Sequence, residues 1–482
     1  MEQFDEDVRN LVRVNVVHGF WKREDQSRLN LAEQALKYPN IKLLTAYMPE
    51  MFGTHHSKML ILFRHDFTAQ IIIHTANMIP FDWTNMTQAL WKSPHLPLLS
   101  PEKPTPIEPF KIDSGPKFKL DLLNYLLAYD TKRITCKPLV EQLLKYDFSE
   151  IKAALVASVP GKQGIEISPS QTAWGWAGLT NALKSVSCYH ATQPEIVIQI
   201  SSIASLGPTD KWLTHFLKAL NTSKSPRKFN PKFKIIFPTA DEVRRSINGY
   251  ASGNAIHTKI LTPAQGKQLA YLKPMLCPWA GDGAQHSSSS SLPSNSSSQS
   301  SAPSEPKVQE AYRKRAAPHI KTYTRFSSDT SSTSSFQKSI DWMLVISANL
   351  SKQAWGEPVN SAGEVRICSY EIGVLVWPDL WKEKQSGMKV KMVPCFGTDT
   401  PFVSSVPYFG NANQKKTDVE EEQLNRRRDD GQREDQEESN LIVVGVRMPY
   451  DLPLTPYGED DVPWCASASY SEPDWMGNTW KT

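Results

Sequence analysis

The sequence lacks the features that mark a membrane-bound or secreted protein. It contains no uninterrupted apolar run of about 18 residues, the length that crosses a bilayer as a helix. Its first residues, MEQFDED, are acidic, whereas a signal peptide begins with basic residues followed by an apolar stretch. We therefore expect a soluble, non-secreted protein.

Cysteine is scarce, and neither sign of charge dominates. The 482 residues include 6 cysteines, none in a C-x-x-C pair, so the sequence predicts neither a zinc site nor a disulfide framework. This usage is typical of a reducing compartment. Lysine and arginine number 54 against 50 aspartates and glutamates, a net charge of +4 that excludes a histone-like protein. Nucleic-acid binding would have to come from a local site.

Apolar residues make up 40% of the chain, enough for sizeable cores. Strand-like and helix-like segments alternate from the N-terminus, a pattern that favours an α/β fold. The expected strands are 12–17, 41–44, 59–63, 71–74, 153–157 and 196–200, and the expected helices are 26–38, 118–129, 139–146 and 179–186.

The pattern restarts near residue 150, which predicts two domains, 1–150 and 151–482. Two segments of the second domain have low complexity. One is rich in serine, at about 283–306, and the other carries blocks of both charges, at about 411–440. Because such segments cannot bury enough apolar surface to offset the entropy of ordering, we expect disordered insertions.

One sequence unit occurs twice. It consists of a His-x-Lys triplet, apolar strand residues, an asparagine and, six residues later, a tryptophan. The first copy holds His56, Lys58, Asn77 and Trp83, and the second holds His319, Lys321, Asn349 and Trp355. A third triplet at 257–259 lacks the asparagine and the tryptophan, so we interpret it as a chance occurrence.

The repeated unit has a chemical use. Residues i and i+2 of a strand point to one face, so each triplet presents an imidazole and an ammonium group together. Two copies facing each other would surround one cavity with two imidazoles, two ammonium groups and two carboxamides, which suits a tetrahedral phosphodiester. Free imidazole titrates near about 6.5, so one ring can be a nucleophile and the other an acid. Because the lysine ammonium groups compensate the negative charge of the phosphate, we expect no metal or other cofactor.

At these residues the chain resembles the phospholipase D superfamily and, within it, the tyrosyl-DNA phosphodiesterase family. Segments 52–59 (FGTHHSKM) and 318–323 (PHIKTY) are similar to that family's two motifs, and segments 201–207, 369–375 and 449–453 add support. The resemblance covers nearly the whole chain except the two insertions. It implies an α/β fold of two pseudo-twofold-related α-β-α sandwich domains of phospholipase D type.

One departure separates the chain from the lipid-cleaving members of that superfamily. Those members carry the pattern His-x-Lys-x-x-x-x-Asp, but Phe63 and Phe326 occupy the two aspartate positions here. Asp66 and Asp329 lie three residues too late, and we expect them in turns. The departure favours the DNA-processing branch.

The resemblance implies a covalent mechanism. His56 would attack phosphorus and form a phosphohistidine, and His319 would protonate the departing tyrosine oxygen and then activate the water that releases a 3′-phosphate. The other implied catalytic residues hold the phosphate oxygens or orient the rings: Lys58, Lys321, Asn77, Asn349, Gln88 and Glu371.

The resemblance also implies DNA contacts. Phe52 would stack on a base, and Ser202, Ser205 and Thr239 would contact phosphates. The same sequence is equally compatible with structural roles, a phenylalanine in the core and a serine-rich turn. The implied partners are single-stranded or duplex DNA with a 3′ adduct and a topoisomerase-derived peptide. The implied location is the nucleus, and we expect a monomer.

Three residues near the motifs are expected to be structural, and some alternatives stay open. We expect Trp83 and Trp355 to be packing residues and His55 to point away from His56. Relative to the resembling family, the chain begins late, so the first domain is expected to lack an edge element. Two alternative functions stay open. One is another phosphodiesterase of phospholipase D type, either a nuclease or a lipase, and the other is an inactive nucleic-acid-binding relic.

Overall fold

The structure is a computed structural model that describes residues 11–101, 110–130, 134–168, 171–188, 194–224, 230–279, 308–313, 315–328, 338–382, 388–401 and 441–482. Both expected insertions and Asp329 lie outside the described residues. The strands are β1 (Val14–His18), β2 (Ile41–Thr45), β3 (Met59–Phe63), β4 (Ala69–His74), β5 (Met86–Thr87), β6 (Leu90–Lys92), β7 (Ala154–Ser158), β8 (Gly161–Gly164), β9 (Glu195–Gln199), β10 (Lys232–Ile236), β11 (Leu276–Cys277), β12 (Ala317–Pro318), β13 (Thr322–Ser328), β14 (Lys338–Ile346), β15 (Glu364–Ile367), β16 (Glu371–Val376), β17 (Lys389–Cys395) and β18 (Leu441–Arg447). The helices are α2 (Gln26–Leu36), α3 (Pro80–Thr84), α4 (Gly115–Ala128), α5 (Lys137–Leu143), α6 (Gly175–Leu183), α7 (Lys211–Leu220), α8 (Ala240–Arg245), α9 (Pro263–Leu272) and α10 (Lys352–Trp355), with 3₁₀ helices η1 (Gly249–Ala255), η2 (Lys273–Met275) and η4 (Pro378–Trp381).

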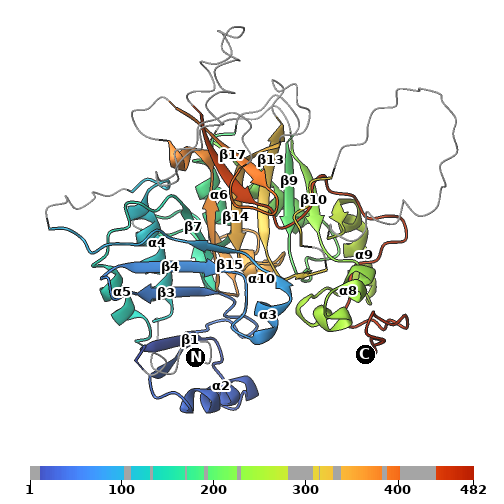
Figure 1. The fold of residues 1–482 in the computed structure, drawn as a ribbon, viewed down its shortest axis with the longest axis horizontal. Coiled ribbons are helices and arrows are strands. Elements are labelled where there is room, and N and C mark those ends of the chain that lie inside the picture. Colours follow the sequence, from blue (N-terminus) through green and yellow to red (C-terminus); the bar gives the residue numbers. More distant parts are fainter. Residues whose placement is uncertain are drawn as a thin grey trace, which may run out of the picture.

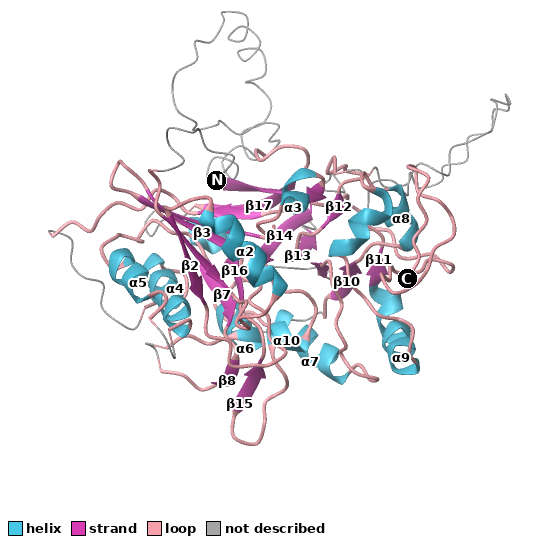
Figure 2. Ribbon diagram, turned by 90° about the horizontal axis from the view of Figure 1, so that it is seen from below, coloured by secondary structure: helices cyan, strands magenta, loops and turns pink. Residues whose placement is uncertain are grey.

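A mixed sheet runs through the centre of the molecule in the order β11-β10-β9-β13-β14-β16-β7 (Figure 1). β9, β10 and β11 are parallel to one another, and β13 is antiparallel to both β9 and β14. The parallel pair β9 and β10 is joined through α7, as parallel strands require a crossover connection. Figure 2 shows β7, β16, β14, β13 and β10 in succession, with α6 and α7 on one side.

The N-terminal part builds smaller sheets beside the central one. β3, β4 and β6 form an antiparallel sheet, and β1 pairs in parallel with β2. One short pairing joins the two halves directly, because β5 of the first repeat pairs with β12 of the second.

Two hydrophobic cores lie on either side of β7 and β16. Leu155 and Ala157 of β7 face the core of the N-terminal part, whereas Ala154 and Val156 face the core of the C-terminal part. This alternation follows from the two-residue period of a strand, which lets one buried strand serve two cores. The boundary near residue 150 stays a prediction, since the strand that follows it belongs to both.

The expected strands and helices are present, with boundaries shifted by a few residues. The repeat is also structural: β3 and β4 form one antiparallel pair and β13 and β14 form the other. Each pair begins directly after a His-x-Lys triplet, and the asparagine lies three residues beyond its second strand. Among the residues described, no helix has the length and apolar character to cross a membrane.

Candidate active site

The two His-x-Lys triplets are joined to opposite halves of the chain by their backbones. The His56 N–H donates to the carbonyl of Tyr370 at 3.0 Å, and the His319 N–H donates to the carbonyl of Thr87 at 3.1 Å. Tyr370 and Thr87 each directly precede a residue that the sequence predicts to orient a histidine. Each triplet is therefore held next to Glu371 or Gln88, the residue of the other repeat that the resemblance implies as its orienting partner.

His56 has a carboxylate partner, as the resemblance implies. Its Nδ1 lies 2.9 Å from Oε2 of Glu371, the first residue of β16. The hydroxyl of Ser347 donates to the same oxygen at 2.5 Å, which fixes the carboxylate in place. With its Nδ1 proton directed at Glu371, the ring presents Nε2 as the free nucleophilic nitrogen.

His319 contacts the expected Gln88 and a second residue that was not expected. Its Nδ1 lies 3.1 Å from Oδ2 of Asp82, whereas Nε2 of Gln88 lies 3.4 Å away. Gln88 also accepts a hydrogen bond from the Thr75 hydroxyl at 2.8 Å. An Nδ1–H that donates to Asp82 cannot also accept from Gln88, so Asp82 sets the tautomer. Asp82 could not be recognised from the repeat, because Ala354 occupies the equivalent position in the second copy.

The two lysines are buried beside their own histidines. Lys58 Nζ donates to the carbonyl of His56 at 2.6 Å. Lys321 Nζ donates to the carbonyl of His319 at 2.5 Å and contacts its Nε2 at 3.1 Å. Burial lowers the pKa of Lys58 to about 8, and it lowers the pKa of the fully buried Lys321 strongly. An anion bound here would relieve the cost of these buried charges.

The two triplets influence each other electrostatically, which indicates that they belong to one site. Burial lowers the pKa of His56, Glu371 opposes the shift, and the charges of Lys58 and Lys321 lower the pKa further. Burial, followed by the charge of Lys321, lowers the pKa of His319 to about 3, and Lys58 also contributes. Each lysine therefore acts on the histidine of the other triplet. Among the described residues, no cluster of three or more His, Cys, Asp or Glu side chains is arranged to hold a metal ion.

The two asparagines border this cluster. Asn349 Oδ1 accepts from the backbone N–H groups of Ser201 and Ser202 at 3.1 and 2.9 Å, which directs its Nδ2 donor away from them. The backbone N–H of Asn77 donates to Asp82 Oδ2 at 2.6 Å. Asn77 is thereby tied to the carboxylate that contacts His319.

The predicted DNA contacts differ in accessibility. The Phe52 side chain is free to stack, since the residue is 75% exposed, and Ser205 is also exposed. Ser202 is half-buried beside Asn349. Thr239 is only 5% exposed, and its hydroxyl accepts the N–H of Glu242 as the N-cap of α8. Its side chain is therefore committed to this cap and is not accessible to a DNA phosphate.

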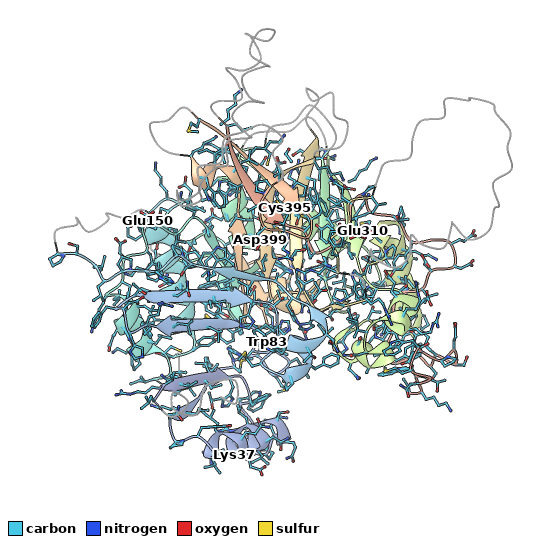
Figure 3. All side chains as sticks on the ribbon, viewed as in Figure 1. Lys37, Trp83, Glu150, Glu310, Cys395 and Asp399 are labelled. Carbon is cyan, nitrogen blue, oxygen red and sulfur yellow. The ribbon has the colours of Figure 1, made fainter. Side chains whose placement is uncertain are left out.

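The residues expected to be structural gave mixed results. The prediction is confirmed for His55, whose Nε2 contacts the hydroxyl of Tyr129 at 3.0 Å, and for Trp355, which is 0% exposed. It is wrong for Trp83, which is 54% exposed on α3 (Figure 3). The Trp83 indole N–H donates to the carbonyl of Asn77 at 2.8 Å, so the ring is anchored at the border of the site.

The turn expected at Asp66 is confirmed. Its carboxylate accepts hydrogen bonds from the backbone N–H and the hydroxyl of Thr68 in the β3–β4 turn, at 3.1 and 2.6 Å. At the position that an aspartate occupies in lipid-cleaving members, Phe63 ends β3. In the second repeat, Phe326 lies buried within β13.

Two antiparallel strand pairs, each preceded by a His-x-Lys triplet, therefore contribute their histidines and lysines to one electrostatic cluster, the arrangement that a two-histidine phosphodiesterase requires. Residues 1–458 match the family model described as tyrosyl-DNA phosphodiesterase. The chain is 31% identical to a probable tyrosyl-DNA phosphodiesterase of Schizosaccharomyces pombe, over 100% of this chain and 87% of that protein. It is 30% identical to tyrosyl-DNA phosphodiesterase 1 of Arabidopsis thaliana, over 98% of this chain and 68% of that protein.

A solved structure shares the fold. The crystal structure of yeast tyrosyl-DNA phosphodiesterase superposes with a TM-score of 0.56 at 19% identity, covering 94% of this chain and 86% of that one. The chain belongs to the tyrosyl-DNA phosphodiesterase family and is therefore a phosphodiesterase.

Proposed function

We propose that this enzyme hydrolyses the 3′-phosphotyrosyl bond that links DNA to a topoisomerase-derived peptide, and acts on other blocked 3′ ends. The observation that carries the proposal is the pairing of each histidine with one carboxylate, His56 with Glu371 and His319 with Asp82, at 2.9 and 3.1 Å. Both rings are thereby fixed with Nδ1 protonated, which leaves Nε2 of His56 free to react and directs Nε2 of His319 toward the ammonium group of Lys321 at 3.1 Å.

In the first step, His56 Nε2 attacks phosphorus. The N–P bond forms while the bond from phosphorus to the tyrosine oxygen breaks, and His319 gives its Nε2 proton to that oxygen. Tyrosine has a pKa near about 10, so protonation of the leaving group lowers the barrier. The negative phosphate offsets the lysine charges that lower the pKa of His319, which favours the protonated acid in the bound state.

In the second step, water attacks the phosphohistidine. His319, now neutral, takes one proton from that water, the N–P bond breaks, and the electron pair returns to His56. The product is a DNA 3′-phosphate, and both histidines regain their starting state. The phosphate oxygens are held by donors from the two repeats: Lys58, Asn77, Lys321 and Asn349.

DNA is gripped outside the reacting centre. Phe52 offers an exposed ring for base stacking, and Ser202 and Ser205 offer hydroxyl donors to phosphates. The substrate is single-stranded or duplex DNA with a 3′ adduct. We propose that the enzyme acts as a monomer in the nucleus, which a fluorescent fusion and size-exclusion chromatography would test.

Turnover of a 3′-phosphotyrosyl oligonucleotide by the purified chain, in excess chelator, tests this function. The expected products are free tyrosine and a 3′-phosphate, with unchanged rate under chelation because lysines supply the positive charge. His56→Ala should abolish turnover, and His65→Ala, an exposed histidine of the β3–β4 turn, should not. Choline release from lipid without cleavage of DNA would instead support a lipase. Inertness on DNA and lipid, with DNA binding retained, would support a relic.

A further inference from the structure

A row of polar residues extends from the site along one end of the central sheet, the end at which strands β9 and β14 terminate. Ser202 forms a single parallel bridge with His257, and the next residue, Ile203, forms one with Leu350. The His257 N–H donates to the carbonyl of Ser201 at 2.9 Å, and the Ile203 N–H donates to the carbonyl of His257 at 2.8 Å. Three segments that follow β14, β9 and η1 therefore lie side by side.

Side-chain directions follow from this register. Adjacent residues on an extended segment point to opposite faces, and bridged partners point to the same face. Ile203 and Leu350 are both buried, so their neighbours Ser202 and Asn349 share the opposite face. His257 is bridged to Ser202 and joins that face. The order across the three segments is Asn349, Ser202 and His257.

The third His-x-Lys triplet lies at the outer end of this row. Ile256 and Thr258 are buried, whereas His257 and Lys259 are exposed, an alternation that puts the imidazole and the ammonium group on one side. Partial burial of the ring and then the charge of Lys321 lower the pKa of His257, so the ring lies within electrostatic reach of the second catalytic triplet.

We propose that His257 and Lys259 form a phosphate-binding subsite for the DNA strand, which holds a phosphodiester next to the scissile one. The inference rests on the proposed function. Neighbouring strands lie about 4.8 Å apart, so His257 is about 10 Å from Asn349, a distance that suits a further phosphate of the same strand. An imidazole N–H and an ammonium group both donate hydrogen bonds, and phosphate oxygens accept them.

A DNA strand fits this row better than the peptide adduct. The row consists of hydrogen-bond donors and begins at Asn349, which would hold the scissile phosphate. Every phosphate carries the same charge and acceptors, so such a subsite would bind DNA without regard to sequence. The triplet at 257–259 lacks the asparagine and the tryptophan of the repeat, which is why the sequence predicted a chance occurrence, but a binding subsite needs neither residue.

The test compares two substrates that share one leaving group. One is a single nucleoside 3′-phosphotyrosine, and the other is an oligonucleotide ending in 3′-phosphotyrosine. The His257→Ala/Lys259→Ala variant should raise KM for the oligonucleotide by about tenfold and leave kcat unchanged. Its kinetics on the mononucleotide should match those of the unmodified enzyme. Lys259→Arg should retain most of the oligonucleotide affinity.

Binding provides a readout that does not depend on turnover. Anisotropy titration of a fluorescent oligonucleotide with a 3′-phosphate should show about tenfold weaker binding by the double variant and a salt dependence reduced by about one counterion. Lys218→Ala is the matched control. Helix α7 runs back from the carboxyl end of β9, so Lys218 lies toward the amino end of that strand, away from the row. Thermal melting should be the same for all variants.

The outcomes separate this inference from the proposed function. If the unmodified enzyme cleaves neither substrate but the double variant weakens product binding, the subsite stands and the proposed function fails. If the unmodified enzyme cleaves both and the variant is unaffected, the subsite is wrong. An equal loss on both substrates would also overturn it, since His257 and Lys259 would then serve the catalytic centre or the leaving group.

Discussion

The carboxylate of Asp82 lies 3.1 Å from Nδ1 of His319, and it comes from the other copy of the repeat. Glu371 contacts His56 in the opposite sense, from the second copy to the first. Each histidine thus receives one carboxylate across the interface between the repeats, but from positions that are not equivalent. Gln88, which the resemblance implies as the counterpart of Glu371, is neutral and lies farther from His319.

Asp82→Asn should impair protonation of the leaving group. Asp82 raises the pKa of His319 against burial and the charge of Lys321, so its loss lowers that pKa further. The acid must be protonated to act, and the falling limb of the pH–rate profile therefore moves to lower pH. At pH 7, kcat for a 3′-phosphotyrosyl substrate should drop on the order of 10²-fold.

The leaving group provides the control for this prediction. A 3′-(4-nitrophenyl) phosphate ester releases a weaker base than tyrosine and needs less help from an acid. Asp82→Asn should therefore slow the tyrosyl substrate much more than the nitrophenyl one, as measured by stopped-flow kinetics over a range of pH. Equal slowing of both substrates would mean that Asp82 holds the fold of the site rather than the proton of His319.

Phe52→Ala should weaken DNA binding without altering chemistry. Stacking of a base on an aromatic ring contributes about 1–3 kcal/mol, so KM for a single-stranded substrate should rise about tenfold while kcat stays the same. Phe67→Ala is a matched control, since Phe67 is 74% exposed in the turn at the far end of β3. A comparable effect of both variants on KM would remove Phe52 from the DNA-binding surface.

The two tryptophans of the repeat should behave differently. Trp355 is fully buried and its indole N–H donates to the hydroxyl of Tyr323 at 3.2 Å, so Trp355→Ala should lower the free energy of unfolding by about 3–5 kcal/mol. Trp83→Ala removes a ring that is mostly in solvent and should cost less than about 1 kcal/mol. Urea titration followed by circular dichroism would measure both, and equal losses would contradict the assigned environments.

Local patterning was sufficient to predict much of the fold. Apolar runs such as 59–63 and 196–200 form strands at those positions because they are bounded by polar turns. The repeat also predicted which histidines and lysines come together. The pairing of β5 with β12 could not be predicted, because short strands far apart in sequence carry no mutual signal.

The missed residues share one physical reason. Asp82 has an alanine as its repeat counterpart, and His257 belongs to a triplet without a repeat partner, so comparison of the two copies gave no signal for either. Their environments are created by tertiary contacts, with Asp82 reaching His319 and His257 bridging to Ser202. Trp83 was misjudged for the converse reason, because a shared spacing does not require shared burial.

The central claim is that His56 and His319 act on one phosphorus atom, as nucleophile and acid. The most direct measurement is a denaturing gel of His319→Ala incubated with a labelled 3′-(4-nitrophenyl) phosphate oligonucleotide, followed by peptide mapping of any adduct. The account predicts a covalent protein–DNA species on His56 that decays slowly, and none with His56→Ala. An adduct formed by His56→Ala, or one mapped to another residue, would contradict it.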